Sequence, residues 1–277
     1  MLKKLNTGIF SIAFGVVSIE DNNNWAWFLK ELRFCIDLTR TITFISDRNE
    51  GLINGVSTVF PEHLHSYCLF HLELNLKTKL AGVKGKMKSR IVWKFKQCAT
   101  IGSKEKFDSE LQNLIKEGGK PMEDFIKKLP NEHWADAYFP GCRYGELYSN
   151  VAESWNSKIT AARELPITNM IEEIRYQTML DLAEKARECE KWLDKLCPQQ
   201  QKRLQKALDI GCTWNVGEAG NGVFQVSSDP VTYVDINKRT CICGVWQHRG
   251  FPCEHAAIVL HFSSKLTGNS IHKDTVV

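Results

Sequence analysis

The sequence predicts an α/β fold for most of the chain, followed by a small module of the ββα type near the C-terminus. Apolar, β-branched runs at 8–19 and 41–46 are each followed by residues with helical spacing, at 25–35 and 52–59. This strand–helix–strand–helix order predicts a sheet with polar residues at its strand ends. After Gly211, long helical patterns give way to short strand-like runs and clustered cysteines.

Composition sets broad limits on the class of protein. The 277 residues are 43% hydrophobic and 25% charged, as in an ordinary globular protein of one or two domains. No apolar run reaches the roughly 18 residues of a membrane span, and the N-terminus lacks the apolar region of a signal peptide. We therefore expect an intracellular protein with no membrane partner. Its ten cysteines should be reduced thiols, some of them free to bind metal.

The first strand, at 8–19, is almost continuously apolar, as a strand buried on both faces would be. Asn22 to Asn24 can cap the helix that follows, and Pro61 should end the second helix. Residues from about 72 to 140 are polar, rich in lysine and interrupted by glycines. We interpret them as a helical insertion into the α/β domain.

One stretch of this insertion is strongly basic. Between Lys77 and Lys96 the sequence has eight basic residues and no acidic residue. Such a stripe can contact nucleic-acid phosphates, although a solvated helix face would look the same. The candidate nucleic-acid contacts are Lys84, Lys86, Lys88 and Arg90.

A helical connector is predicted at 166–205. Pro166 precedes a long helix, from about 168 to 196, with one apolar stripe of Met179, Leu182, Ala186, Cys189, Leu193 and Leu196. We expect this stripe to pack on the main domain rather than to form a dimer seam, because it has fewer than three heptads. Pro198 and the glutamines at 199–201 should then close the helical region in a turn.

The C-terminal module contains two strand-like runs, at 222–227 and 231–236, that lead into a cysteine cluster. Three thiols and one imidazole follow at close spacing: Cys241, Cys243, Cys253 and His255. This is the donor set that tetrahedral Zn²⁺ prefers, and four protein ligands leave no open position. The pattern predicts a structural zinc site, against the alternative of free cysteines beside a chance histidine.

The residues around this cluster resemble the SWIM zinc finger, whose pattern is Cys-x-Cys followed by Cys-x-His. The match covers 213–262 and includes Trp246, Gln247, Gly250 and Pro252, with a tail at 263–277. Such a site contributes on the order of ten kcal/mol of coupled binding and folding. The module should therefore need metal to fold.

Further motifs resemble the catalytic domain of Mutator-like (MULE) transposases. They lie at 10–17, 20–29, 45–52, 60–71 and 150–156, and the fourth includes a Cys-x-x-His pair, Cys68 and His71. The resemblance implies an incomplete RNase H-like domain at 1–165. It also implies that Asp47 and Glu153 correspond to the second and third carboxylates that hold two divalent ions in this family.

The first family carboxylate has no counterpart, because residues 1–8 contain no Asp or Glu and Glu20 and Asp21 fall elsewhere in the pattern. We expect catalysis to be lost, so that Mg²⁺ matters only if catalysis survives. Other interpretations stay open. Asp47 can cap a helix, and Glu153 can be a solvated helix residue.

Two structural questions follow from the same comparison. The strand at 8–19 lacks its usual neighbours, so either the two strands pair directly or the domain folds poorly. Cys68 and His71, with His63 and His65 nearby, could form a second metal site, although a buried thiol and a core histidine are the plainer explanation.

The sequence thus predicts a zinc-binding, transposase-derived protein that binds DNA in the nucleus without catalysis, the location being implied by the family. Two alternatives remain. One is an active DNA transposase with metal-dependent strand transfer, truncated only in this gene model, and the other is a protein–protein interaction module.

Overall fold

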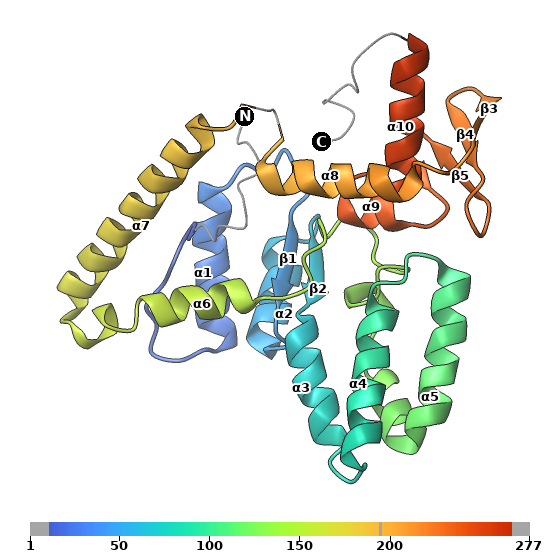
Figure 1. Ribbon diagram of the computed structural model, residues 1–277. Coiled ribbons are helices and arrows are strands. Elements are labelled where there is room, and N and C mark those ends of the chain that lie inside the picture. Colours follow the sequence, from blue (N-terminus) through green and yellow to red (C-terminus); the bar gives the residue numbers. More distant parts are fainter. Residues whose placement is uncertain (1–10, 194–195, 268–277) are drawn as a thin grey trace.

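The computed structural model describes residues 11–193 and 196–267, and the part before the helical region alternates helices with strands (Figure 1). Two short strands pair in parallel, with Thr43 opposite Leu64 and Ser46 opposite Tyr67. The elements of this part are α1 (Asn22–Cys35), β1 (Thr43–Ser46), α2 (Glu50–Val59) and β2 (Leu64–Tyr67). The predicted helices and the predicted strand at 41–46 are confirmed, and β2 was not predicted.

Both helices of this part begin at side-chain caps. The Asp21 carboxylate accepts a hydrogen bond from the Asn24 N–H at 2.8 Å, so Asp21 caps α1 rather than the asparagines that follow it. The Asn49 side chain caps α2 by accepting from Leu52 N–H. Asp47 therefore does not cap α2, although its carboxylate accepts a hydrogen bond from Asn49 N–H at 3.0 Å.

The predicted strand at 8–19 is not formed in its described part, from residue 11 onward. Residues 8–10 lie outside the described residues. The segment lies instead against α1, where Gly15 closely approaches Phe28, and against α6, where the rings of Phe14 and Trp155 lie 6.0 Å apart. Ile12 is 76% exposed. A strand buried on both faces needs a neighbour on each edge, and this segment has none among the described strands.

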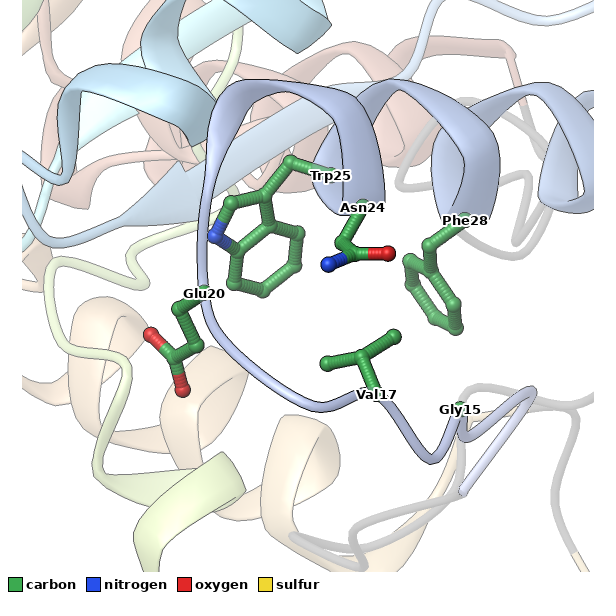
Figure 2. Close-up of a pocket in the computed structure, with 6 residues that line it drawn as sticks. All are labelled: Gly15, Val17, Glu20, Asn24, Trp25 and Phe28. Atoms are coloured by element: carbon green, nitrogen blue, oxygen red, sulfur yellow. The ribbon is translucent and has the colours of Figure 1, made fainter.

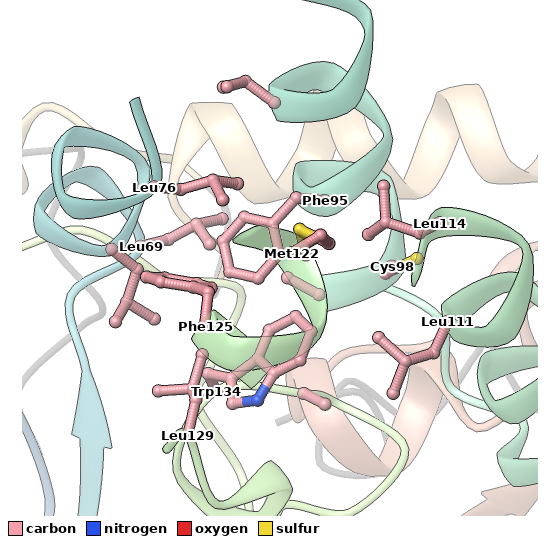
Figure 3. Packing of buried hydrophobic residues seen from close by; sticks show 14 of the residues in the cluster. Leu69, Leu76, Phe95, Cys98, Leu111, Leu114, Met122, Phe125, Leu129 and Trp134 are labelled. Carbon is pink, nitrogen blue, oxygen red and sulfur yellow. The ribbon is translucent and has the colours of Figure 1, made fainter. Parts of the chain in front are cut away.

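The next part is helical, as predicted, and forms the largest core of the described chain (Figure 3). Trp134 lies at its centre, stacked on Phe95 with ring centroids 4.7 Å apart and tilted against Phe107 at 5.5 Å. The helices that surround it are α3 (Leu69–Lys79), α4 (Gly85–Ala99) and α5 (Lys104–Ile126), followed by the short η1 (Asn131–His133). We call this part the helical body.

One buried arginine joins the helical body to the strands. The side chain of Arg143 is 2% exposed, and its guanidinium pairs with the carboxylate of Asp136. It also donates to the hydroxyl of Ser66 on β2 at 3.2 Å, and to the carbonyl oxygens of Trp134 at 2.8 Å and Ala99 at 3.2 Å. A buried charge is tolerated only when it is paired and hydrogen-bonded in this way.

The following helices are α6 (Asn150–Lys158), η2 (Ala162–Glu164) and α7 (Ile167–Glu190). The expectation that the stripe of α7 packs on the main domain is wrong, since Met179 is 56% exposed and Leu182 is 44% exposed. Ile174, outside that stripe, is the buried residue of α7 and packs with Ile159 and Ala162. The spacing of the apolar residues predicted a helix here, although α7 ends at Glu190 and not near Leu196, and it could not say whether a partner covers the helix face.

The C-terminal part is an antiparallel sheet in the order β3–β4–β5–β6, packed against helices. The hairpin of β4 and β5 was predicted; β3 was not. Residues 199–201, which we expected in a turn, are helical, because Pro198 occupies the first turn of a helix and does not end one. The elements are α8 (Pro198–Gly211), β3 (Val216–Gly220), β4 (Val223–Val226), β5 (Thr232–Asp235), β6 (Thr240–Cys241), α9 (Val245–Arg249) and α10 (Glu254–Thr267).

This part has its own core, in which Val226, Val234 and Val259 have no exposed surface. Leu204 and Ala207 of α8 belong to the same core, so the module extends beyond two strands and one helix. We call it the cysteine module.

All ten cysteines lie in described segments and carry free thiols. Among the helices of the described chain, none is both long and apolar enough to cross a membrane.

Candidate metal centre

The four predicted ligands come from three different local structures. Cys241 ends β6, Cys243 follows it in a turn, and Cys253 and His255 lie at the start of α10. The loop between the pairs is shaped by Gly244 and Gly250, whose positive φ angles of 75° and 58° bound the short helix α9.

The donor atoms of these residues all lie within 4.8 Å of one another. The Nδ1 atom of His255 is 3.7 Å from the Cys241 sulfur and 3.9 Å from the Cys253 sulfur. A tetrahedral ion with metal–sulfur bonds of about 2.3 Å and metal–nitrogen bonds of about 2.0 Å needs sulfur–nitrogen separations of about 3.6 Å. The donor set and its dimensions therefore fit Zn²⁺.

Three further contacts hold the ligands in place. Gln247 accepts from the Cys241 N–H at 3.2 Å and donates to its carbonyl oxygen at 2.9 Å. The ring of Trp214 stacks on His255 at 4.9 Å, and the Ala256 N–H points at the Cys253 sulfur at 3.5 Å. Outer contacts of this kind fix the orientation of metal ligands. Trp214 was missed, because its sequence position just before β3 gives no sign of the stacking.

The three thiols influence one another's ionisation. Hydrogen bonds from Cys241 and Cys253 hold the pKa of Cys243 far below its usual value, whereas the bond with Cys243 raises the pKa of Cys241 to about 12. The pKa of Cys253 is also raised, through its bonds to the other two thiols and its burial. A cation is what allows all three to ionise together, as zinc does when it binds thiolates.

The loop between the ligand pairs, residues 243–250, lies directly on the helical body. A Cβ atom on Gly102 would come within 2.5 Å of the Cys243 carbonyl oxygen, and one on Gly244 within 2.5 Å of the Gly102 carbonyl oxygen. The Arg143 N–H donates to the carbonyl oxygen of His248 at 3.0 Å. The cysteine module therefore packs on the helical body through backbone contacts that leave no room for a side chain at Gly102 or Gly244.

The two candidate carboxylates lie on elements that meet near the ends of the paired strands. Asp47 follows β1, and the Cys68 N–H after β2 donates to the Ser46 carbonyl oxygen at 2.6 Å. The Glu153 carboxylate on α6 is exposed and lies 3.4 Å from Nε2 of His71 on α3. The structure thus pairs Glu153 with the histidine of the Cys-x-x-His motif.

Cys68 is fully buried and accepts a hydrogen bond from the Ser149 N–H at 3.2 Å. Burial acts to raise its pKa, but hydrogen bonds from Ser149 and His71 outweigh it and hold the pKa below its usual value. The cysteine module contains the one grouping of three or more metal-binding side chains in the described chain. The second metal site considered around Cys68 and His71 is therefore not formed there.

Some of the basic stripe is neutralised by neighbouring helices. Glu117 of α5 pairs with Arg90 at 2.7 Å and also with Lys94, and Glu73 of α3 pairs with Lys96 at 3.2 Å. The sequence could not show this, since both glutamates lie outside the stretch. Of the eight basic residues in the stripe, five lysines have no ion pair in the described chain, and they lie around the turn between α3 and α4: Lys77, Lys79, Lys84, Lys86 and Lys88.

A hollow beside α1 has a mostly apolar lining and contains no constellation of catalytic groups (Figure 2). Val17 and Phe28 face each other across it, and the Glu20 carboxylate lies at its edge. It marks the place where the unpaired segment at 11–19 lies over the helix.

Two family models match the chain. Residues 3–75 match the model described as MULE transposase domain, and residues 224–263 match the model described as SWIM zinc finger. No match was found among curated proteins or among solved structures. The second match contains all four ligands, and the first contains Asp47 and the Cys-x-x-His pair. The chain thus carries a match to a MULE transposase domain in its first part and a match to a SWIM zinc finger near its C-terminus.

Proposed function

We propose that this protein binds DNA through the lysines at the turn between α3 and α4, on a scaffold whose cysteine module is held together by a structural Zn²⁺. The observation that carries the DNA-binding proposal is the set of five lysines that have no acidic partner in the described chain. Phosphate contacts by such residues supply most of the sequence-independent affinity for DNA. The match to a transposase domain supports the same partner.

The local backbone adds to the positive field at this turn. α4 begins at Gly85 with no acidic residue in its first turn and no side-chain cap on its free N–H groups. The positive end of a helix and nearby lysines attract the same anions. Three of the four residues predicted to contact nucleic acid, Lys84, Lys86 and Lys88, lie here, while Arg90 shares its charge with Glu117.

We further propose that the first part derives from an RNase H-like domain and acts without strand transfer, in the nucleus. In support, no group of three or more metal-binding side chains in the described chain includes Asp47 or Glu153. Two divalent ions held by too few carboxylates would bind weakly, and their positive charge would be only partly neutralised. Imaging of a tagged protein would test the location.

The DNA-binding proposal is tested by fluorescence anisotropy with a labelled duplex over about 0.05 to 0.2 M salt. The variant K84Q/K86Q/K88Q should bind at least about tenfold more weakly at the lower salt. The slope of its log affinity against log salt should be smaller in magnitude by up to about three. A control with the same net charge, K30Q/K191Q/K202Q, changes exposed lysines on α1, after α7 and on α8. It should bind like the wild type.

Equal binding by the two triple variants would contradict the assignment of this surface. A wild-type protein with no salt-dependent affinity for DNA would overturn the proposal as a whole. That result would favour the alternative that the molecule is a protein–protein interaction module.

A further inference from the structure

One aromatic side chain on the basic surface is not explained by the fold. Trp93 of α4 is 59% exposed, although the buried face of the same helix provides apolar surroundings through Ile91, Phe95 and Cys98. In the described chain its indole has no ring contact and no hydrogen bond. A large side chain left in water on an otherwise polar face often marks a binding surface.

The residues around Trp93 on this helix face are polar or basic. Lys86, Arg90, Trp93 and Gln97 follow one another at steps of four, three and four residues, so they share one face, and all four are exposed. The distance along the axis from Lys86 to Trp93 is about 10 Å. One strand of nucleic acid can therefore meet the lysines and the indole at the same time.

We propose that Trp93 is a stacking platform for unpaired bases, so that this surface binds single-stranded DNA or frayed duplex ends in preference to intact duplex. The proposal rests on the DNA binding proposed above and adds the form of DNA recognised. The indole offers a flat π-face, which bases stack on whatever their sequence, and the lysines hold the phosphates. In an intact duplex the base faces already cover one another, so an indole cannot reach them.

The position of the ion pairs agrees with this arrangement. Glu117 of α5 pairs with Arg90 and Lys94, and Glu73 of α3 pairs with Lys96, so these ion pairs link α4 to its two neighbouring helices. The exposed face carries the indole and Lys86, with no carboxylate among the exposed residues of α4.

The test compares labelled oligo(dT) with a duplex of the same length by anisotropy, using W93A, W93F and the wild type. W93A should bind oligo(dT) at least about fivefold more weakly, while its duplex affinity should stay within about twofold of the wild type. W93F keeps a ring and should recover most of the loss. Since a stacked indole changes its emission, oligo(dT) should alter the fluorescence of the wild type more than that of W93F.

The matched control is W27A, which removes another exposed tryptophan, 48% exposed, from α1; Figure 1 draws α1 well to the left of α4, with β1 and β2 between them in the view. W27A should bind oligo(dT) like the wild type. Circular dichroism and zinc content identify any variant that fails to fold.

Three results would overturn the inference: W93A binding oligo(dT) within about twofold of the wild type, equal losses for oligo(dT) and duplex, or equal losses in W27A and W93A. The first of these, combined with lysine-dependent duplex binding, leaves the proposed function intact. Absence of all nucleic-acid binding in the wild type removes both proposals. If the triple lysine variant loses oligo(dT) binding and W93A does not, the surface contacts phosphates only and Trp93 does not stack on bases.

Discussion

The backbone N–H of Arg143 donates a hydrogen bond to the carbonyl oxygen of His248 at 3.0 Å, so one residue touches both the helical body and the cysteine module. Its guanidinium meanwhile bonds to Asp136, Ser66 and two backbone carbonyl oxygens. The two parts are thus joined through a residue that is itself buried.

Replacing this arginine should be strongly destabilising. Arg143→Ala leaves the partly buried carboxylate of Asp136 without its partner and several buried acceptors without a donor, which should cost about 3–5 kcal/mol of unfolding free energy. Arg143→Lys keeps the charge but loses the forked geometry and should recover only part of this. Urea denaturation measures both. As a control, Arg33→Ala removes an exposed ion pair with Glu62 and should cost about 1 kcal/mol or less of unfolding free energy. A similar loss of unfolding free energy in Arg143→Ala and Arg33→Ala would contradict the prediction.

The close backbone approach of Gly102 and Gly244 predicts a second sensitive position. Gly244→Ala adds a methyl group at a φ of 75° and within 2.5 Å of the Gly102 carbonyl oxygen, so it should lose at least about 2 kcal/mol. Gly217→Ala in β3 meets no atom within 4 Å and should be neutral or slightly stabilising. Thermal denaturation of the two variants gives the comparison, and an unchanged melting temperature in the first would refute the prediction.

Zinc content provides the third prediction. The purified protein should hold one zinc ion per chain, and C253A/H255A should hold none and lose the protease resistance of the cysteine module, because binding and folding are coupled. Cys212→Ala changes an exposed thiol outside the cluster and should keep the ion. Elemental analysis measures the zinc content, and limited proteolysis measures the protease resistance of the cysteine module. The metal assignment fails if the wild type is zinc-free or if the double variant remains as resistant as the control.

Stability should also fall in mild acid because of His65. Burial, with a further effect of His133, lowers the pKa of His65 to about 4 from 6.5. Between these two pH values the unfolded chain takes up a proton that the folded chain does not. Stability from this group is therefore complete above the unfolded pKa of 6.5 and decreases as pH falls toward 4, by an amount on the order of 2 kcal/mol.

The variant His65→Gln removes this titration and keeps a polar group that can reach the hydroxyl of Ser46, which bonds to His65 at 2.7 Å. Urea midpoints at about pH 7 and about pH 5 should therefore differ less in the variant than in the wild type. Equal pH dependence in both proteins would show that His65 is not responsible.

The last prediction concerns catalysis. We expect no nicking of supercoiled DNA with Mg²⁺ or Mn²⁺, because Asp47 and Glu153 offer too few carboxylates for two ions. Asp47→Asn should therefore behave as the wild type in a gel assay. Metal-dependent cleavage that disappears in this variant would restore the enzymatic alternative.

The features predicted from sequence are those set by nearby residues. The four ligands are held by short spacings and by glycine turns within one module, so their pattern is visible in the chain itself. The helix α1 shows the same local control through its apolar spacing, although its cap, Asp21, was not the residue predicted. For β2, the short and half-polar run from Leu64 to Tyr67 gives too little signal to be recognised.

Features that depend on distant residues could not be predicted. The run at 11–19 has the composition of a buried strand, but whether it becomes one depends on neighbours elsewhere in the chain. Pro198 can end or begin a helix, and only the packing of Leu204 and Ala207 in the core of the cysteine module shows which. The partners of Arg143, drawn from four separate segments, are likewise invisible before the chain is folded.

The unpaired segment at 11–19 has a practical consequence. Val16 and Ile19 are 52% and 62% exposed, within a β-branched stretch that lacks the charges and prolines with which soluble proteins protect such edges. Chains brought close together can pair through this stretch, and pairing of that kind is open-ended. Aggregation through this stretch, rather than thermal unfolding, should therefore limit the concentration at which the purified protein can be stored.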